Sequence, residues 1–126
     1  MYIYVHYSRH MEIKNATDSF AALSQGTRLE VFRLLVRHEP EGLPAGEIAR
    51  QLSVPHNTMS AHLSVLSRAG WIVSRRQGRS IIYRASLGHM QQTLNFLIHD
   101  CCAGHPDVCE PFWVTFNECS INEGQE

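Results

Sequence analysis

The sequence lacks the features that define membrane, secreted and repeat proteins. No apolar run approaches the roughly 18 residues of a membrane span, there is no secretory hydrophobic segment, and neither internal repeats nor low-complexity segments occur. The chain also has no Cys-x-x-Cys motif and no glycine-rich phosphate loop, so we expect it not to be an enzyme. Its 126 residues suit one domain with some additional tail, which we expect to be cytoplasmic and not bound to a membrane.

Cysteine is absent before position 101, and all four cysteines lie in the last 26 residues. Because a cytoplasmic chain is kept reduced, structural disulfides are not expected. The thiols are then available for metal or redox chemistry. Separately, we expect the protein to require no cofactor.

Lysine and arginine are absent after Arg84, where six acidic residues occur. Between residues 27 and 84, by contrast, there are nine arginines and four glutamates. The formal net charge of −1 therefore hides a basic segment followed by an acidic one. Such segregation matters more for nucleic-acid binding than the total charge does, so the basic segment is the candidate DNA-binding region.

Residues 47–69 carry two helical patterns separated by a turn. Apolar residues recur at helical spacing on one face of each pattern: Ile48, Ala49 and Leu52 in the first, and Met59, Leu63 and Leu66 in the second. Residues 53–55 break the first helix, and Pro55 is tolerated where a second helix starts. Two short helices joined by a tight turn predict a helix-turn-helix unit.

The second of these helices has short or flat polar side chains in its first two turns, as a recognition helix requires. Asparagine can pair with adenine through two hydrogen bonds, and serine and threonine suit several bases or phosphates. The candidate DNA-binding residues here are His56, Asn57, Thr58, Ser60, Ala61 and His62. The alternative is an ordinary helix pair with a polar, solvated face.

A basic hairpin is predicted directly after this unit. The β-branched and aromatic runs 71–74 and 81–84 flank residues 75–80, and Gly78 suits the positive φ of the turn. Arg75, Arg76 and Arg79 lie near the tip, where they would contact phosphates or a narrow minor groove as a wing does. A solvated arginine turn is the alternative.

Helices are predicted on both sides of this region. Residues 15–19 offer caps for a first helix carrying residues 20–23, and Gly26 ends it. Thr27 would cap the next helix, 28–38, with Glu30 completing a capping box. That helix would bury Leu29, Phe32, Leu35 and Val36. A further helix starts near Pro44.

The last predicted helix is capped by Ser86 and runs to about Cys102. Its apolar residues are Leu87, Met90, Leu94, Leu97 and Cys101. Their 3-4 spacing is typical of a seam between two long helices, so we expect a homodimer, with core packing inside one chain as the alternative. The expected fold is mainly α with a β-hairpin wing (α+β), a winged helix-turn-helix dimerising through its terminal helices. We divide it into an N-terminal arm (1–15), the winged domain (16–103) and a cysteine-bearing tail (104–126).

The order of these elements resembles the ArsR/SmtB family of winged helix-turn-helix metalloregulatory repressors. The resemblance runs from about residue 16 to 109, and its specific segments are 22–29, 47–49, 57–66, 69–72, 75–79 and 83–84. It implies a homodimeric transcription repressor that binds double-stranded operator DNA when free of effector. Binding of the effector releases it from the DNA.

Family members differ in where the effector binds. Residues 43–48 lack the cysteines that the founding arsenic sensors carry on the helix before the turn, so that site is absent. His89 and His99 resemble part of the zinc sensors' site on the last helix, but its paired carboxylates and its spacing are missing.

The chain instead carries Cys101, Cys102 and Cys109 where the last helix ends. This resembles the arsenic(III)-sensing subgroup, which has a vicinal cysteine pair and a third cysteine just beyond the helix, and it implies a metal site at these residues and a role in arsenic resistance. Soft thiolates select soft metals and metalloids, so the implied effector is arsenic(III), as arsenite or methylarsenite, or antimony(III). Adjacent residues of a helix point about 100° apart, so the pair converges only where Gly104 and Pro106 end the helix.

Two alternatives stay open for the cysteines. One is a thiol-based redox or persulfide sensor, or another metal sensor, of the same fold. The other makes Cys101 a small apolar seam residue and the rest stray thiols. Cys119 has no assigned role; it could replace Cys109 as the third ligand.

Overall fold

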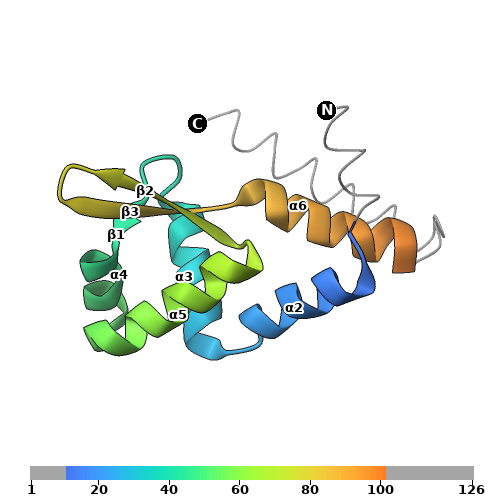
Figure 1. Ribbon diagram of the computed structural model, residues 1–126, viewed down its shortest axis with the longest axis horizontal. Helices are drawn as coiled ribbons and strands as arrows, with labels where there is room; N and C mark the ends of the chain where they lie inside the picture. The colour runs from blue at the N-terminus through green and yellow to red at the C-terminus, as the bar shows by residue number, and fades with distance from the viewer. Residues whose placement is uncertain (1–10, 102–126) are drawn as a thin grey trace.

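The computed structural model describes residues 11–101, and Figure 1 shows their arrangement as an α+β fold. The helices and strands in chain order are α2 (Ile13–Leu23), α3 (Gly26–Arg37), β1 (Leu43–Pro44), α4 (Ala45–Leu52), α5 (His56–Ala69), β2 (Ile72–Gln77), β3 (Ser80–Ala85), α6 (Leu87–Asn95) and the π-helix η1 (Phe96–Cys101). No helix among the described residues is both long and apolar enough to cross a membrane. The predicted winged helix-turn-helix is confirmed.

The helix-turn-helix consists of α4 and α5, which pack against each other and against α3. Its predicted inner face is correct, because Ile48, Met59, Leu63 and Leu66 are at most 2% exposed in one hydrophobic core. The turn between the helices starts at Ser53, which adopts a left-handed conformation with φ of 55°. This packing fixes which side of α5 is left for solvent.

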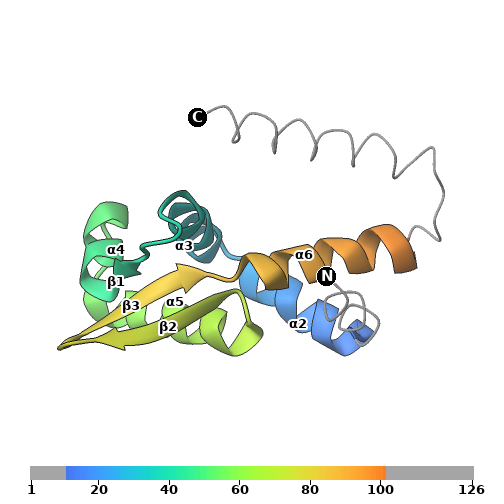
Figure 2. The same cartoon turned by 90° about the horizontal axis from the view of Figure 1, so that it is seen from above.

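The wing is the antiparallel pair β2–β3, which projects from one end of the molecule while α6 projects from the other (Figure 2). Its register pairs Gln77 with Ser80 across a two-residue turn, and Gly78 supplies the positive φ of 65° that the sequence predicted. The short strand β1 pairs with β3 and completes a sheet of order β1-β3-β2. The sequence did not predict β1, because two residues are too few to show an alternating pattern.

The starts of the first two helices differ from the prediction. Helix α2 already begins at Ile13, inside the segment assigned to the arm. The N-cap of α3 is Gln25, whose side-chain Oε1 accepts the N–H of Arg28 at 2.8 Å. Thr27 therefore lies inside the helix, and the predicted capping box with Glu30 is wrong.

The buried face of α3 is also rotated from the predicted one. Val31, Phe32, Leu34 and Leu35 are buried, whereas Leu29 is 43% exposed. Of the four predicted residues, Phe32 and Leu35 are thus buried, and Val36 is half-buried and packs against the same core. The i, i+3, i+4 set that begins at Val31 is the one that meets α4 and the sheet.

Helix α6 begins as predicted, because the Ser86 side chain accepts the N–H of His89. Its regular part ends at Asn95, and residues 96–101 form the π-helix η1, which the sequence did not predict. A π-helix bonds i to i+5 and so takes more residues per turn than the regular helix that the spacing predicts. Leu87 is 42% exposed, and the residues buried along this segment are Gln92, Thr93, Phe96 and Ile98.

Candidate nucleic-acid interface

The exposed side of α5 carries one continuous stripe of residues. At about 100° per residue, positions 57, 61, 64 and 68 fall within roughly 60° of one another around the helix. The side chains there are Asn57, Ala61, Ser64 and Arg68, and all four are exposed. The sequence prediction stopped at residue 62 and missed Ser64 and Arg68, although the same period leads to them.

Most of the predicted recognition residues are solvent-facing. His56, Asn57, Thr58, Ser60 and Ala61 are exposed, whereas His62 is half-buried. The Nδ1 atom of His62 lies 3.4 Å from Nη1 of Arg28, which reaches it from α3. His62 therefore lies on the flank of the stripe, against a neighbouring helix.

Asn57 makes a local hydrogen bond. Its side-chain Oδ1 accepts the backbone N–H of Thr58 at 2.9 Å. This satisfies one of the donors that the first turn of a helix leaves without a partner. The amide NH₂ of Asn57 stays available as a donor at the start of α5.

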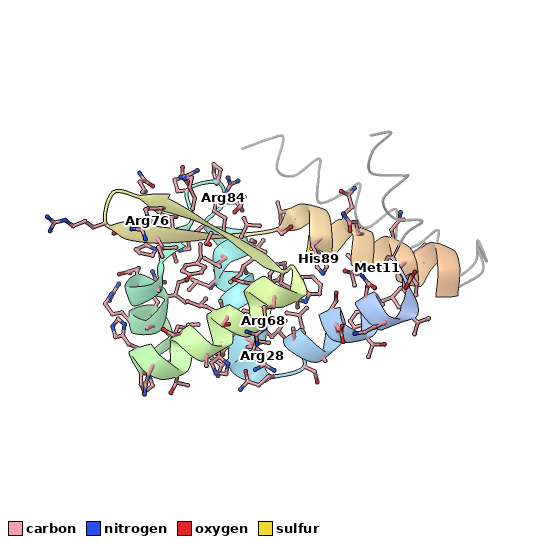
Figure 3. The ribbon with its side chains drawn as sticks, in the orientation of Figure 1. Met11, Arg28, Arg68, Arg76, Arg84 and His89 are labelled. Atoms are coloured by element: carbon pink, nitrogen blue, oxygen red, sulfur yellow. The ribbon has the colours of Figure 1, made fainter. Side chains whose placement is uncertain are left out.

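The three wing arginines do not share one face. Arg75 pairs with Ile82 and Arg76 with Ile81 in the β2–β3 ladder, and successive residues of a strand point to opposite sides. Arg76 is therefore on the side of Tyr83 and Ala85, both of which belong to or pack against the core. Figure 3 labels Arg76 on the wing, with Arg68 and Arg28 beside α5. Arg79 is exposed in the turn.

The positive charge of the α5 stripe and the wing tip is not neutralised by acids among the described residues. Within residues 11–101, ion pairs join Lys14 to Asp18, Arg50 to Glu47 and Arg84 to Glu39. The Arg84 pair holds the base of the wing to the segment after α3 through two bonds of 3.2 and 2.7 Å. The arginines of the α5 stripe and the wing tip take part in none of these described pairs. Their charge is available to an anionic partner such as DNA.

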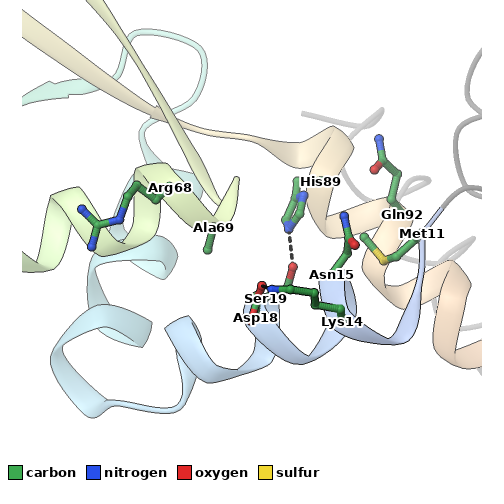
Figure 4. Close-up of a pocket in the computed structure, with 9 residues that line it drawn as sticks. All are labelled: Met11, Lys14, Asn15, Asp18, Ser19, Arg68, Ala69, His89 and Gln92. Carbon is green, nitrogen blue, oxygen red and sulfur yellow. Dashed lines mark hydrogen bonds and ion pairs between the residues drawn. The ribbon is translucent and has the colours of Figure 1, made fainter.

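A network of polar and aromatic contacts connects Trp71, which lies just after α5, to α2 and α6 (Figure 4). Nε2 of His89 lies 2.9 Å from Oγ of Ser19, and the His89 ring meets Trp71 edge-on, with centroids 4.7 Å apart. The Trp71 indole N–H donates to the Ser19 carbonyl at 2.7 Å, and Ser86 N–H donates to the Trp71 carbonyl at 2.8 Å. Burial lowers the pKa of His89 below its ordinary value, which favours the neutral ring.

The same network borders a cavity of about 290 Å³ between α2, the end of α5 and α6. Its walls include Lys14, Asp18, Ser19, Arg68 and His89. The cavity thus lies beside the place where α2 and α5 pack against each other.

The predicted metal site falls mostly outside the described residues. Cys101 is the last residue of η1, while Cys102 and Cys109 lie beyond the part of the chain that the structure describes. Among the residues that are described, no three His, Cys, Asp or Glu side chains gather closely enough to hold a metal ion. The three-cysteine site stays a prediction.

Comparison with known proteins agrees with this geometry. A helix-turn-helix domain family matches residues 23–75. The HTH-type transcriptional regulator KmtR of Mycobacterium tuberculosis is 33% identical over 75 residues, which cover 60% of this chain and 55% of KmtR. The chain thus spans about half the length of this curated relative.

Two solved structures share the fold. One is the homodimeric winged helix-turn-helix DNA-binding domain of a possible ArsR-family transcriptional regulator from Mycobacterium bovis, at 26% identity and a TM-score of 0.55, covering 69% of this chain and 85% of that one. The other is described as a possible transcriptional regulator for arsenical resistance, at 26% identity and a TM-score of 0.55, covering 61% of this chain and 77% of that one. The helix-turn-helix match and these shared structures show that the chain carries a helix-turn-helix domain within a winged helix-turn-helix fold, similar to that of a possible ArsR-family transcriptional regulator.

Proposed function

We propose that the protein is a cytoplasmic homodimeric repressor that binds operator DNA and is released by trivalent arsenic. The observation that carries the DNA-binding part is the exposed polar stripe of α5, which continues into Arg68 and lies beside a wing whose arginines are not paired with acids. Side chains at the start of α5 would contact bases in the major groove, and the wing would contact phosphates.

The homodimer is supported by apolar surface on the terminal helices. Ile13 and Phe20 on α2 are 69% and 38% exposed, and Leu87 on α6 is 42% exposed. Large apolar side chains on neighbouring helices are typical of an interface, and the related domain from Mycobacterium bovis is homodimeric. Two copies would place their recognition helices in successive major grooves about 34–36 Å apart.

The effector site we propose consists of Cys101, Cys102 and Cys109. Trivalent arsenic and antimony are soft, and thiolates are the ligands that soft ions prefer. The helix that leads to these cysteines ends in η1, and π-helical turns are frequent at functional sites. The similar structure described as a possible transcriptional regulator for arsenical resistance supports a link to arsenicals.

Release requires only a modest coupling between the two sites. A coupling free energy of about 1–3 kcal/mol weakens DNA binding roughly 5- to 150-fold. A ligand that closes the chain after η1 would shift α6, and α6 is connected through His89 to Trp71 and Ser19. Trp71 comes two residues after the end of α5, so a shift of α6 would change how α5 is held.

The test is operator release measured side by side with arsenite, antimonite, methylarsenite and zinc in reducing buffer. We expect the trivalent species to release the wild type and zinc not to do so. The double variant Cys101→Ser, Cys102→Ser should bind the operator like the wild type and no longer respond to arsenite. Normal release of this variant would place the effector site elsewhere, while leaving the DNA-binding proposal intact.

Replacing the third cysteine separates effectors by the number of sulfurs that they need. Cys109→Ser should impair the response to arsenite and spare a methylated arsenical that needs only two thiolates. The thiol-based redox alternative predicts the opposite condition for release, namely an oxidant without any metalloid. Release by metalloid under full reduction therefore decides between the two.

A further inference from the structure

A groove beside the C-terminal half of α5 brings together arginines from two helices. It has a volume of about 370 Å³ and lies where α2, α3 and α5 meet. Its lining residues are Asp18, Ala21, Ala22, Arg28, Val65, Arg68 and Ala69. Figure 3 shows the labelled Arg28 and Arg68 side chains next to each other at this place.

Both arginines are positioned by bonds to uncharged groups. Nε of Arg28 donates to the Ala22 carbonyl at 2.6 Å, and Nη1 of Arg68 donates to Oγ of Ser64 at 2.7 Å. Each guanidinium has five N–H donors, so these bonds leave most of them unused. The arrangement fixes where the two cations lie and leaves donors for a ligand with several acceptor oxygens.

The groove keeps a net positive charge. Its one acidic wall residue, Asp18, is paired with Lys14 at 3.1 Å. Neither Arg28 nor Arg68 forms an ion pair with any acid in residues 11–101. Two unneutralised cations side by side repel each other, and a bound anion removes that repulsion.

The groove continues the surface that faces DNA in the proposed function. Arg68 lies on the same stripe as Asn57, and eleven residues of helix separate them by about 16 Å. A helix whose first turns lie in a major groove brings its far end toward the sugar-phosphate backbone. Arginine forks match phosphate oxygens with two parallel hydrogen bonds.

We propose that Arg28 and Arg68 form a phosphate clamp that holds the DNA backbone beside the C-terminal half of α5. This clamp is separate from the wing and rests on the proposed DNA-binding function. It contributes affinity and register for every sequence alike, because phosphates carry no base information. Ser64 orients Arg68 within it.

The test compares Arg68→Gln with the control Arg33→Gln, which removes the same charge from an exposed site of α3 outside the groove. Binding is measured from low to high salt on a duplex selected by the wild type from a random pool and on an unrelated duplex. Arg68→Gln should weaken both and flatten the plot of log K against log salt by about 0.9, the value of one phosphate contact. Arg68→Lys should restore most of the slope, since it restores the charge.

Three results would overturn the clamp. Equal slopes for Arg68→Gln and Arg33→Gln would show that the groove does not meet DNA, whereas a change in sequence preference would show that Arg68 contacts bases. If the wild type binds neither duplex, the proposed function fails together with the clamp. For Arg28→Gln, the unfolding temperature is measured as well as DNA binding, because Arg28 also binds the end of α2. The double variant Arg28→Gln, Arg68→Gln should have a flatter salt dependence than Arg68→Gln alone.

Discussion

Nε2 of His89 and Oγ of Ser19 lie 2.9 Å apart, although 70 residues separate them in the chain. This bond connects α6 to α2, and the ring of His89 packs against Trp71 at the end of α5. One side chain of α6 therefore contacts both α2 and the junction that follows α5. A residue in that position affects both stability and the transmission of movement.

We predict that His89→Gln destabilises the fold by about 1–3 kcal/mol, because it removes an edge-on aromatic pair and a partly buried hydrogen bond. Urea unfolding at pH 7.5 measures this. Ser19→Ala removes the hydrogen bond and keeps the aromatic pair, so it should cost less than His89→Gln. Equal costs would show that the contact with Trp71 contributes nothing.

His89 should also make the stability of the fold depend on pH. Burial lowers the pKa of His89 in the folded state below its ordinary value of 6.5. As the pH falls below 6.5, His89 therefore becomes protonated in the unfolded chain while it is still mostly neutral in the folded chain. The stability due to neutral His89 is therefore complete above pH 6.5 and is lost as pH falls through the folded pKa. Between pH 7.5 and 5.5, wild-type stability to urea should drop more than that of His89→Gln. Parallel drops would show that other groups cause the change.

Gly70 allows the close approach of His89. Its φ is +95°, and a Cβ there would lie 2.9 Å from the His89 ring. Gly78 also has a positive φ, of +65°, but nothing lies near its Cβ direction. We expect Gly78→Ala to cost about 1–2 kcal/mol of backbone strain. Gly70→Ala should cost an additional 1–3 kcal/mol or so, because it also overpacks the junction.

Thermal unfolding of both glycine variants gives the comparison. The difference between them isolates the His89 contact, since both carry the strain of a positive φ. A Gly70→Ala variant no less stable than Gly78→Ala would mean that His89 moves aside at little cost.

Local patterns predicted the parts of this fold that depend on local chemistry. The apolar periods of α4 and α5 and the glycine of the wing turn determine their elements directly. The N-cap of α3 was missed because glutamine is not among the preferred cap residues, and the spacing of Thr27 and Glu30 imitates a capping box. The π-helix was missed because the apolar spacing from Leu87 to Cys101 also fits a regular helix.

The candidate interface was predicted in part for a similar reason. Ser64 and Arg68 extend a period that the sequence already shows. Arg28, in contrast, comes from another helix, and only the packing of α3 against α5 brings it to His62. The sequence also placed Arg75 and Arg76 together at the wing tip, where strand alternation separates them.

We predict that the two wing arginines contribute unequally to DNA binding. Arg76 shares the side of the wing that packs toward the helices, whereas Arg75 is on the opposite side with Arg84. Arg76→Gln should therefore flatten the salt dependence by about one phosphate contact, and Arg75→Gln should change it less. The pair is a matched control, because each variant loses one exposed charge. The reverse order would mean that the other side of the wing meets the DNA.

Asn57 should contribute sequence preference and not general affinity. Its Oδ1 is bonded to the Thr58 N–H, so pairing with adenine through two bonds requires that local bond to break, while its NH₂ can donate to a base without any change. Asn57→Ala should cost about 1–3 kcal/mol on the selected duplex and much less on an unrelated one. Asn15→Ala, which alters an exposed asparagine on α2, is the control and should change neither. If Asn57→Ala weakened both duplexes equally, Asn57 would act on the backbone or on the start of α5, because loss of a base contact cannot affect a sequence that lacks the base.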